Sequence, residues 1–126
     1  QAESALRECG ITLNRNALPF DSNGPWYTSG LRIGTAAVTT LGMGRAEMEQ
    51  IAAVVADVVR HLEPADIAKG PKAGQPSRAR YRLADEVRTR ARRSVDELVS
   101  RYPLYPEIDL EFLEAGLADP ASASTE

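Results

Sequence analysis

The chain has 126 residues, of which 43% are hydrophobic and 26% charged, and its formal net charge is −3. This length and composition fit one compact domain with a modest core. The single cysteine, Cys9, excludes an internal disulfide and a thiolate metal cluster, and it suits a reducing cytosol. No apolar run approaches the roughly 20 residues that a membrane-spanning helix needs.

The net charge is unevenly distributed along the chain. Residues 61–101 carry ten Lys and Arg against six acids, whereas residues 102–126 carry six acids and no Lys or Arg. An acidic segment that follows a basic helix favours neutralisation within or between chains over nucleic-acid binding.

Short elements and a loop are predicted in the first 34 residues. Apolar spacing predicts a helix over 2–9, and Gly10 is a typical residue for ending it. Alternating polarity predicts strands over 11–14 and 27–34, separated by a Pro- and Gly-rich loop over 17–25. Because the chain opens inside a helical pattern, we expect it to be a segment of a longer protein.

Two long helices are predicted in the second half. The first begins just after Gly44, where apolar residues recur every three or four positions, and Pro64 closes it. Residues 63–77 are rich in Pro and Gly and are interpreted as an exposed, mobile linker or insertion. The second helix is expected from Ser77, as a capping residue, to Arg101.

These elements predict an α+β (α/β) fold, with a short sheet covered by helices on one face. We expect one domain over 1–117, in which residues 108–117 dock as a short helix or extended segment, and a disordered tail over 118–126. Two strands are too few to be stable alone, so a further strand is expected upstream.

Arg32 is the first candidate for a binding residue. In a strand, Leu31 and Ile33 face one way and Arg32 the other, with the bare backbone of Gly30 and Gly34 beside it. A guanidinium in such a place can bind a carboxylate or phosphate through two parallel hydrogen bonds. The alternative is an exposed arginine paired with a surface acid, and spacing alone favours that alternative.

Other reactive residues are better explained by structure than by chemistry. His61 has no companion ligands, so we expect no metal site, and Cys9 is expected in the core. A stretch of arginines could contact phosphates, but acids interrupt it and a solvated helix face is favoured. Its members are Arg78, Arg80, Arg82, Arg88, Arg90, Arg92 and Arg93.

Several longer motifs resemble the C-terminal region of serine hydroxymethyltransferase. They are Gly-Ile-Thr-Leu-Asn-Arg-Asn-Ala-Leu-Pro at 10–19, Asp21, Thr-Ser-Gly-Leu-Arg-Ile-Gly-Thr at 28–35, Thr39, Glu-Met at 47–48, Ile-Ala at 51–52 and Arg-Tyr-Pro-Leu-Tyr-Pro at 101–106. The resemblance is nearly gapless over 5–62, lapses over 63–80 and returns over 95–106. It implies the small C-terminal domain of a fold-type I enzyme that depends on pyridoxal 5'-phosphate.

The resemblance also implies an activity and its site residues. The family interconverts serine and glycine and passes the one-carbon unit to and from tetrahydrofolate. Its substrate-carboxylate arginine falls on Arg32, and its folate-binding residues fall on Asn16, Gly24, Pro25 and Trp26. The family has Ser-Pro-Phe where this chain has Gly-Pro-Trp, so the chain departs from the family at two of the last three positions.

The resemblance implies no catalytic residue on this chain. The lysine that carries the cofactor belongs to the family's large domain, and Lys69 and Lys72 lack its motif. We therefore expect the chain to be inactive alone and to act with its own large domain, serine or glycine and tetrahydrofolate, as a cytoplasmic homo-oligomer. We expect no nucleic-acid or membrane partner.

Two alternatives stay open. The family has proline where this chain has Ala36. It has Arg-Gly-Phe where this chain has the Leu-Gly-Met that ends at Met43. These departures favour a related aldolase or transaldolase, or an α-methylserine hydroxymethyltransferase. An alternative of another class is a non-catalytic module that binds anionic partners through the arginines of 78–93.

Overall fold

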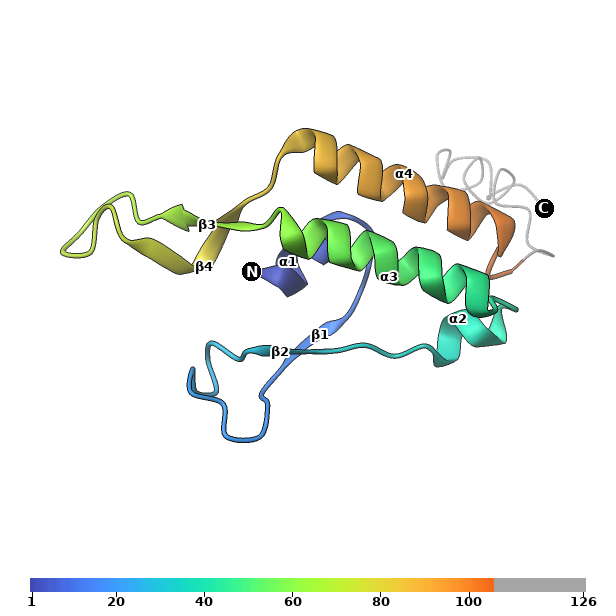
Figure 1. Ribbon diagram of the computed structural model, residues 1–126, viewed down its shortest axis with the longest axis horizontal. Helices are drawn as coiled ribbons and strands as arrows, with labels where there is room; N and C mark the ends of the chain where they lie inside the picture. The colour runs from blue at the N-terminus through green and yellow to red at the C-terminus, as the bar shows by residue number, and fades with distance from the viewer. Residues whose placement is uncertain (106–126) are drawn as a thin grey trace, which may run out of the picture.

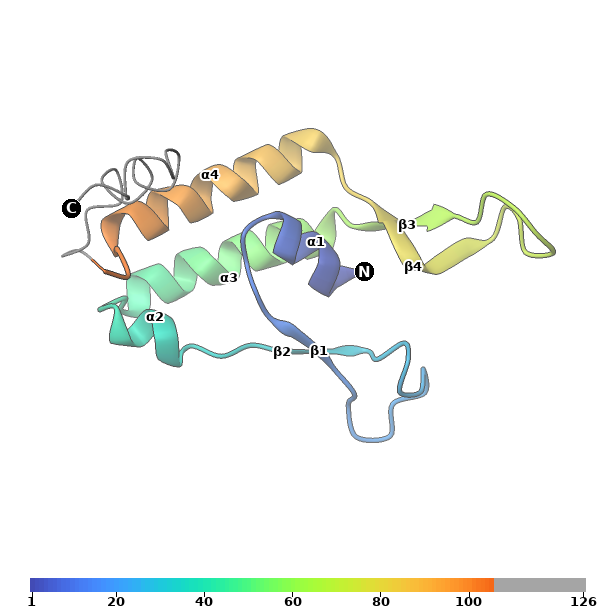
Figure 2. The same ribbon diagram turned by 180° about the vertical axis from the view of Figure 1, so that it is seen from behind.

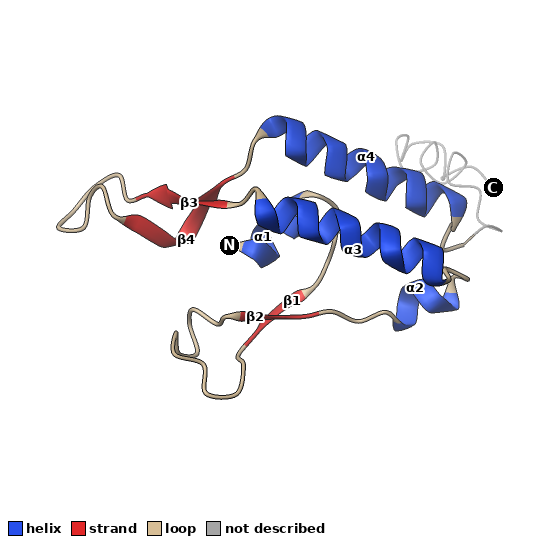
Figure 3. Ribbon diagram, viewed as in Figure 1, coloured by secondary structure: helices blue, strands red, loops and turns tan. Residues whose placement is uncertain are grey.

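The computed structural model describes residues 1–105, which form four helices and two separate antiparallel hairpins (Figures 1 and 3). The elements in chain order are α1 (Ala2–Glu8), β1 (Asn14–Asn16), β2 (Gly30–Arg32), α2 (Ala36–Thr40), α3 (Arg45–Arg60), β3 (Glu63–Asp66), β4 (Pro76–Arg82) and α4 (Asp85–Arg101). The predicted α+β class is confirmed.

The two long helices lie side by side and run in opposite directions (Figure 1). Helix α3 begins where predicted, and the Glu47 carboxylate accepts the backbone N–H of Gly44 at 2.9 Å. This bond satisfies one of the donors that every helix start leaves free, and it lowers the pKa of Glu47. The facing surfaces bury Val58 of α3 and Val87 and Ala91 of α4.

Helix α1 packs against α3 and supplies the most buried side chains (Figure 2). Ala5, Leu6 and Cys9 have no solvent exposure, so the expectation that Cys9 is a core residue is confirmed. Gly10 ends the helix with a φ of +87°, and its N–H and that of Ile11 donate to the last carbonyls of α1 at 3.0 and 2.9 Å. This is a Schellman ending, which glycine adopts without strain.

The first pair of strands is shorter than predicted and displaced along the chain. The strand expected over 11–14 is β1 at Asn14–Asn16, and the strand expected over 27–34 is only β2 at Gly30–Arg32. A short helix, α2, follows β2 and was not predicted. Its five residues are too few for a helical period to stand out in the sequence.

The prediction that a helix begins at Ser77 is wrong. Residues 63–66 and 76–82 pair as the hairpin β3–β4, and α4 begins only at Asp85 (Figure 3). The Ser77 hydroxyl does accept the backbone N–H groups of Ala79 and Arg80, as a capping residue would, but within a strand. The hairpin extends beyond the ends of α3 and α4, away from the core (Figure 1).

The segment expected over 108–117 and the tail over 118–126 lie outside the described residues. Within residues 1–105, no helix is both long and apolar enough to cross a lipid bilayer.

Candidate functional site

The pairing of β1 with β2 places the candidate binding residues on one face. Asn14 lies opposite Arg32, and Asn16 lies opposite Gly30. Residues opposite one another in an antiparallel pair share a face, so both asparagines lie on the Arg32 side. Leu31 faces the other way and packs against the core, as its alternation with Arg32 predicts.

A shallow hollow of about 390 Å³ beside the two strands brings Asn16 together with Arg32. Its lining residues are Glu3, Arg7, Asn14, Arg15, Asn16 and Arg32. The Glu3 carboxylate pairs with Arg7 on its own helix. Within residues 1–105, Arg32 is exposed and forms no ion pair, so its guanidinium edge is open to a ligand.

The two glycines beside Arg32 have different surroundings. A Cβ added at Gly30 would lie 2.6 Å from Leu18 Cδ2 and 2.8 Å from the Asn16 backbone oxygen, so the side chain of Leu18 takes the space expected for a ligand. A Cβ at Gly34 would meet nothing within 4 Å. A ligand can therefore approach the backbone closely at Gly34 but not at Gly30.

The loop between β1 and β2 is ordered by one carboxylate, Asp21. It accepts the backbone N–H of Ser29 at 2.7 Å, that of Asn23 at 3.0 Å and that of Leu18 at 3.3 Å, and the Ser29 hydroxyl at 2.8 Å. These hydrogen bonds, the Ser29 backbone bond above all, hold the pKa of Asp21 well below its usual range. The loop thus has a defined shape although its side chains are exposed.

The predicted folate-binding residues of the loop do not all join the hollow. Trp26 is 82% exposed and lies along a second, larger groove, which shares Glu3 and Arg15 with the hollow. Gly24 adopts a φ of +71°, and neither it nor Pro25 lines the hollow or the groove. The structure therefore groups Asn16 with Arg32 and places Trp26 in the adjoining groove.

Two further arginines reach this region and were not singled out as site residues. Arg15 lines both cavities, and Arg78 of β4 lies over the Tyr27 ring at 5.7 Å. The position of Arg15 between two asparagines was a sequence signal for the first. No local pattern in the sequence indicates Arg78 as a site residue, because its contact with Tyr27 joins residues about 50 positions apart.

The remaining arginines of 78–93 are largely tied to the protein itself. Arg90 pairs with Asp57 at 2.6 Å and Arg82 with Asp66 at 3.1 Å, and Arg88 pairs with Asp85 and with Glu8. Such pairing is typical of a solvated surface.

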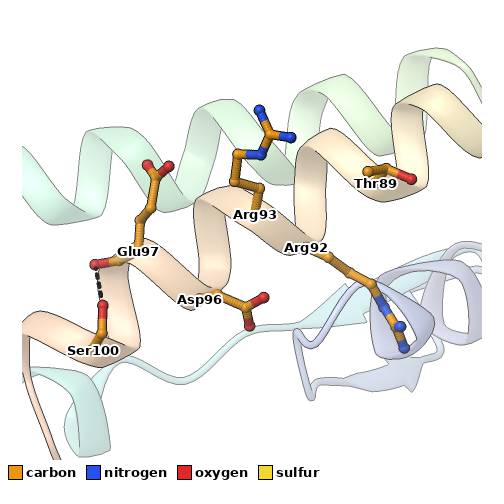
Figure 4. A pocket seen from close by; sticks show the side chains of 6 residues that line it. All are labelled: Thr89, Arg92, Arg93, Asp96, Glu97 and Ser100. Carbon is orange, nitrogen blue, oxygen red and sulfur yellow. Dashed lines mark hydrogen bonds between the residues drawn. The ribbon is translucent and has the colours of Figure 1, made fainter.

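A pocket on α4 is likewise a solvated surface on which charges of both signs lie together (Figure 4). It is lined by Thr89, Arg92, Arg93, Asp96, Glu97 and Ser100. All six come from one helix, and the two cations are balanced by two acids. No second element converges on the pocket, so it resembles a helix surface more than a binding site.

Neither His61 nor Cys9 gains a chemical role from its surroundings. His61 Nδ1 lies 2.8 Å from the Asp57 backbone oxygen at the end of α3, and within residues 1–105 no cluster of three metal-binding side chains occurs. Burial raises the pKa of the Cys9 thiol, which keeps it protonated and unreactive.

Comparison with known proteins tests the family resemblance. The family model for serine hydroxymethyltransferase matches residues 1–55. The serine hydroxymethyltransferase of Treponema pallidum (strain Nichols) is 51% identical over 115 residues, which cover 91% of this chain and 19% of that protein. The Chlamydia muridarum enzyme is 47% identical over 112 residues, covering 89% of the chain and 22% of that protein.

A third relative agrees with these two. The serine hydroxymethyltransferase of Salinispora tropica is 46% identical over 110 residues, covering 87% of the chain and 22% of that protein. This chain spans about a fifth of the length of the curated relatives that it matches. The resemblance inferred from the motifs is confirmed: over most of its length, this chain is a relative of the serine hydroxymethyltransferases and corresponds to a segment of them.

Proposed function

We propose that this chain is part of a hydroxymethyltransferase that interconverts serine and glycine, and that Arg32 binds the carboxylate of the amino-acid substrate. The observation that supports the proposal is the hollow beside β1 and β2, which Asn16 lines together with an exposed arginine that has no ion pair within residues 1–105. A guanidinium offers two parallel N–H groups that match a carboxylate.

The role of Arg32 is to position the substrate. Two hydrogen bonds fix both the place and the rotation of a carboxylate, whereas a lysine ammonium would fix only its place. In this proposal Arg32 binds and orients the substrate and takes no part in proton transfer.

The one-carbon acceptor in this proposal is tetrahydrofolate, bound beside the substrate. Asn16 offers an amide donor and acceptor in the hollow, and Trp26 offers an exposed ring in the adjoining groove. Gly24 and Pro25 contribute by holding the turn that presents Trp26. Asp21 keeps this loop in shape.

The chain does not fit a pyridoxal 5'-phosphate site on its own. Its only lysines, Lys69 and Lys72, lie between β3 and β4, and neither lines the hollow or the groove. We assign the cofactor, which would supply electron withdrawal from the substrate, to a region of the relatives that this chain does not span. The chain would then be inactive alone and would act with that region, in a homo-oligomer in the cytoplasm.

The substitution Arg32→Lys tests the proposal in the complete polypeptide that carries this segment. We expect kcat/KM for serine to fall roughly 30- to 1,000-fold with the cofactor still bound. This corresponds to a loss of about 2–4 kcal/mol in transition-state stabilisation. Arg45→Lys is the control, because Arg45 is exposed on α3 and pairs with Glu49. Wild-type serine affinity in the Arg32→Lys variant would refute the assignment.

The alternative specificities rest on Ala36 and Met43, and neither lies in the hollow. Ala36 is the first residue of α2, a position where proline is also favoured, and Met43 is buried at 6% exposure. Both departures therefore have structural explanations. Tetrahydrofolate-dependent cleavage of serine by the complete polypeptide distinguishes the readings, since an aldolase or transaldolase would act on a β-hydroxy amino acid without folate.

A further inference from the structure

The larger groove lies between three parts of the chain that are distant in sequence. It has a volume of about 910 Å³ and runs between the start of α1, residues 23–31 and residues 75–79 of the second hairpin. This size falls in the range of small-molecule sites. The groove shares Glu3 and Arg15 with the Arg32 hollow, so the two cavities adjoin.

The lining of the groove includes aromatic and apolar side chains. Trp26 and Tyr27 are 82% and 47% exposed, and Val59 and Leu62, at and just beyond the end of α3, also line the groove. Thr28 also lines the groove, and its hydroxyl oxygen is buried without a hydrogen-bond partner among residues 1–105. Such a lining favours a flat ring that carries polar substituents.

The charges of the groove favour an anion. Its side-chain cations are Arg15 and Arg78, and its acid, Glu3, is already paired with Arg7. Within residues 1–105, Arg78 makes no ion pair, and its guanidinium carbon lies over the Tyr27 ring at 5.7 Å from the centroid. A guanidinium held over an aromatic ring without a paired acid retains N–H groups that can bind a carboxylate.

The wall that carries Arg78 is fixed to the rest of the fold. The Gln1 side-chain amide donates to the backbone oxygens of Ser77 and Arg80, both at 2.7 Å. These bonds join the start of α1 to β4 across the groove. Arg78 is therefore held on the wall of the groove even though the tip of its hairpin lies far from the core (Figure 1).

We propose that Arg78 is a further ligand-binding residue: it binds the carboxylate-bearing end of the folate whose rings lie against Trp26 and Tyr27. This inference rests on the proposed function, since it takes the ligand of the groove to be the folate co-substrate. It adds the β3–β4 hairpin to the site. The resemblance on motifs lapses over that hairpin and assigns it no role.

The test uses two probes of the same shape that differ in charge. One is 5-formyltetrahydrofolate, and the other is its diamide, in which both glutamate carboxylates are converted to amides. Affinities are measured by calorimetry on the complete polypeptide that carries this segment, after far-UV circular dichroism has shown that each variant is folded.

We expect Arg78→Gln to weaken binding of the acid roughly 10- to 100-fold and to leave binding of the diamide unchanged, because only the acid can pair with the guanidinium. Arg80→Gln is the matched control. It removes the same charge from the same strand but lies outside the groove, so both affinities should stay at the wild-type value.

Unchanged binding of the acid by Arg78→Gln, or equal loss of acid and diamide, would overturn the inference and leave the proposed function standing. A complete wild-type polypeptide that binds neither probe would overturn the folate assignment itself. In the same polypeptide, Arg78→Gln should raise KM for tetrahydrofolate by the same factor with kcat unchanged. A wild-type KM in that assay would overturn the inference independently of the calorimetry.

Discussion

The helical body and the β1–β2 hairpin are ordered by different forces. In the body, α1, α3 and α4 bury Leu6, Cys9 and Val58 completely, and apolar burial accounts for their arrangement. In the hairpin, every residue of β1 is exposed, and the loop that follows is held by hydrogen bonds to Asp21.

Because of this difference, the residues that stabilise the fold and the residues proposed to bind ligands lie in different regions of the molecule. A surface ordered by hydrogen bonds can leave its side chains open to a ligand, whereas a surface ordered by apolar burial cannot. The exposed groups that the proposals use, Arg32, Trp26 and Arg78, all lie outside the body. Variants of the two regions should therefore affect different measurements.

The largest effect on stability is expected from Leu6→Ala in the body. Leu6 has no solvent exposure, and truncating such a side chain lowers the free energy of unfolding by about 2–5 kcal/mol. Urea denaturation followed by circular dichroism measures this change. Val99→Ala on the exposed side of α4 is the control, with an expected change within about 0.5 kcal/mol. Equal effects of the two variants would contradict the assignment of the core.

An intermediate and local effect is expected from Asp21→Asn in the hairpin. The amide retains one acceptor oxygen in place of the two that receive the N–H groups of Asn23 and Ser29. We expect lower hydrogen-exchange protection at those two amides and weaker binding of 5-formyltetrahydrofolate, with the midpoint of global unfolding nearly unchanged. A large shift of that midpoint would show that the loop belongs to the cooperative core.

The pH dependence of the same loop follows from the lowered pKa of Asp21. Because the folded-state pKa lies below the ordinary value near 4, the ordering of the loop is complete above that value and is lost as pH falls through the folded pKa. Protection factors at Asn23 and Ser29 should therefore decline on acidification in the wild type and not in Asp21→Asn. Parallel declines in both proteins would assign the effect to another group.

The sequence predicted the body better than the hairpins. Helix α3 has a long 3.6-residue period between Gly44 and Pro64, so its bounds were nearly correct. The β3–β4 hairpin was missed because its Pro and Gly residues indicate a loop. The alternation of Arg78, Arg80 and Arg82 was interpreted as one face of a helix.

The candidate site was predictable only in its local parts. The outward direction of Arg32 follows from alternation along one strand, and the structure agrees with it. The grouping of Asn16 with Arg32 depends on strand register, and the approach of Arg78 to Tyr27 depends on tertiary packing. Neither is encoded in local spacing, so a single sequence does not reveal them.

The smallest effect is expected from Arg90→Gln, which tests whether charge pairing contributes to the order of the body. Arg90 joins α4 to Asp57 of α3 at 2.6 Å, but its side chain is 55% exposed and that of Asp57 is 30% exposed. Such pairs contribute about 0.2–1 kcal/mol, and salt screens them. Urea denaturation should show a loss within this range at low salt that shrinks at 1 M NaCl. A loss as large as that of Leu6→Ala would mean that the two long helices are held together by charge as much as by apolar burial, and the contrast between body and hairpin would no longer hold.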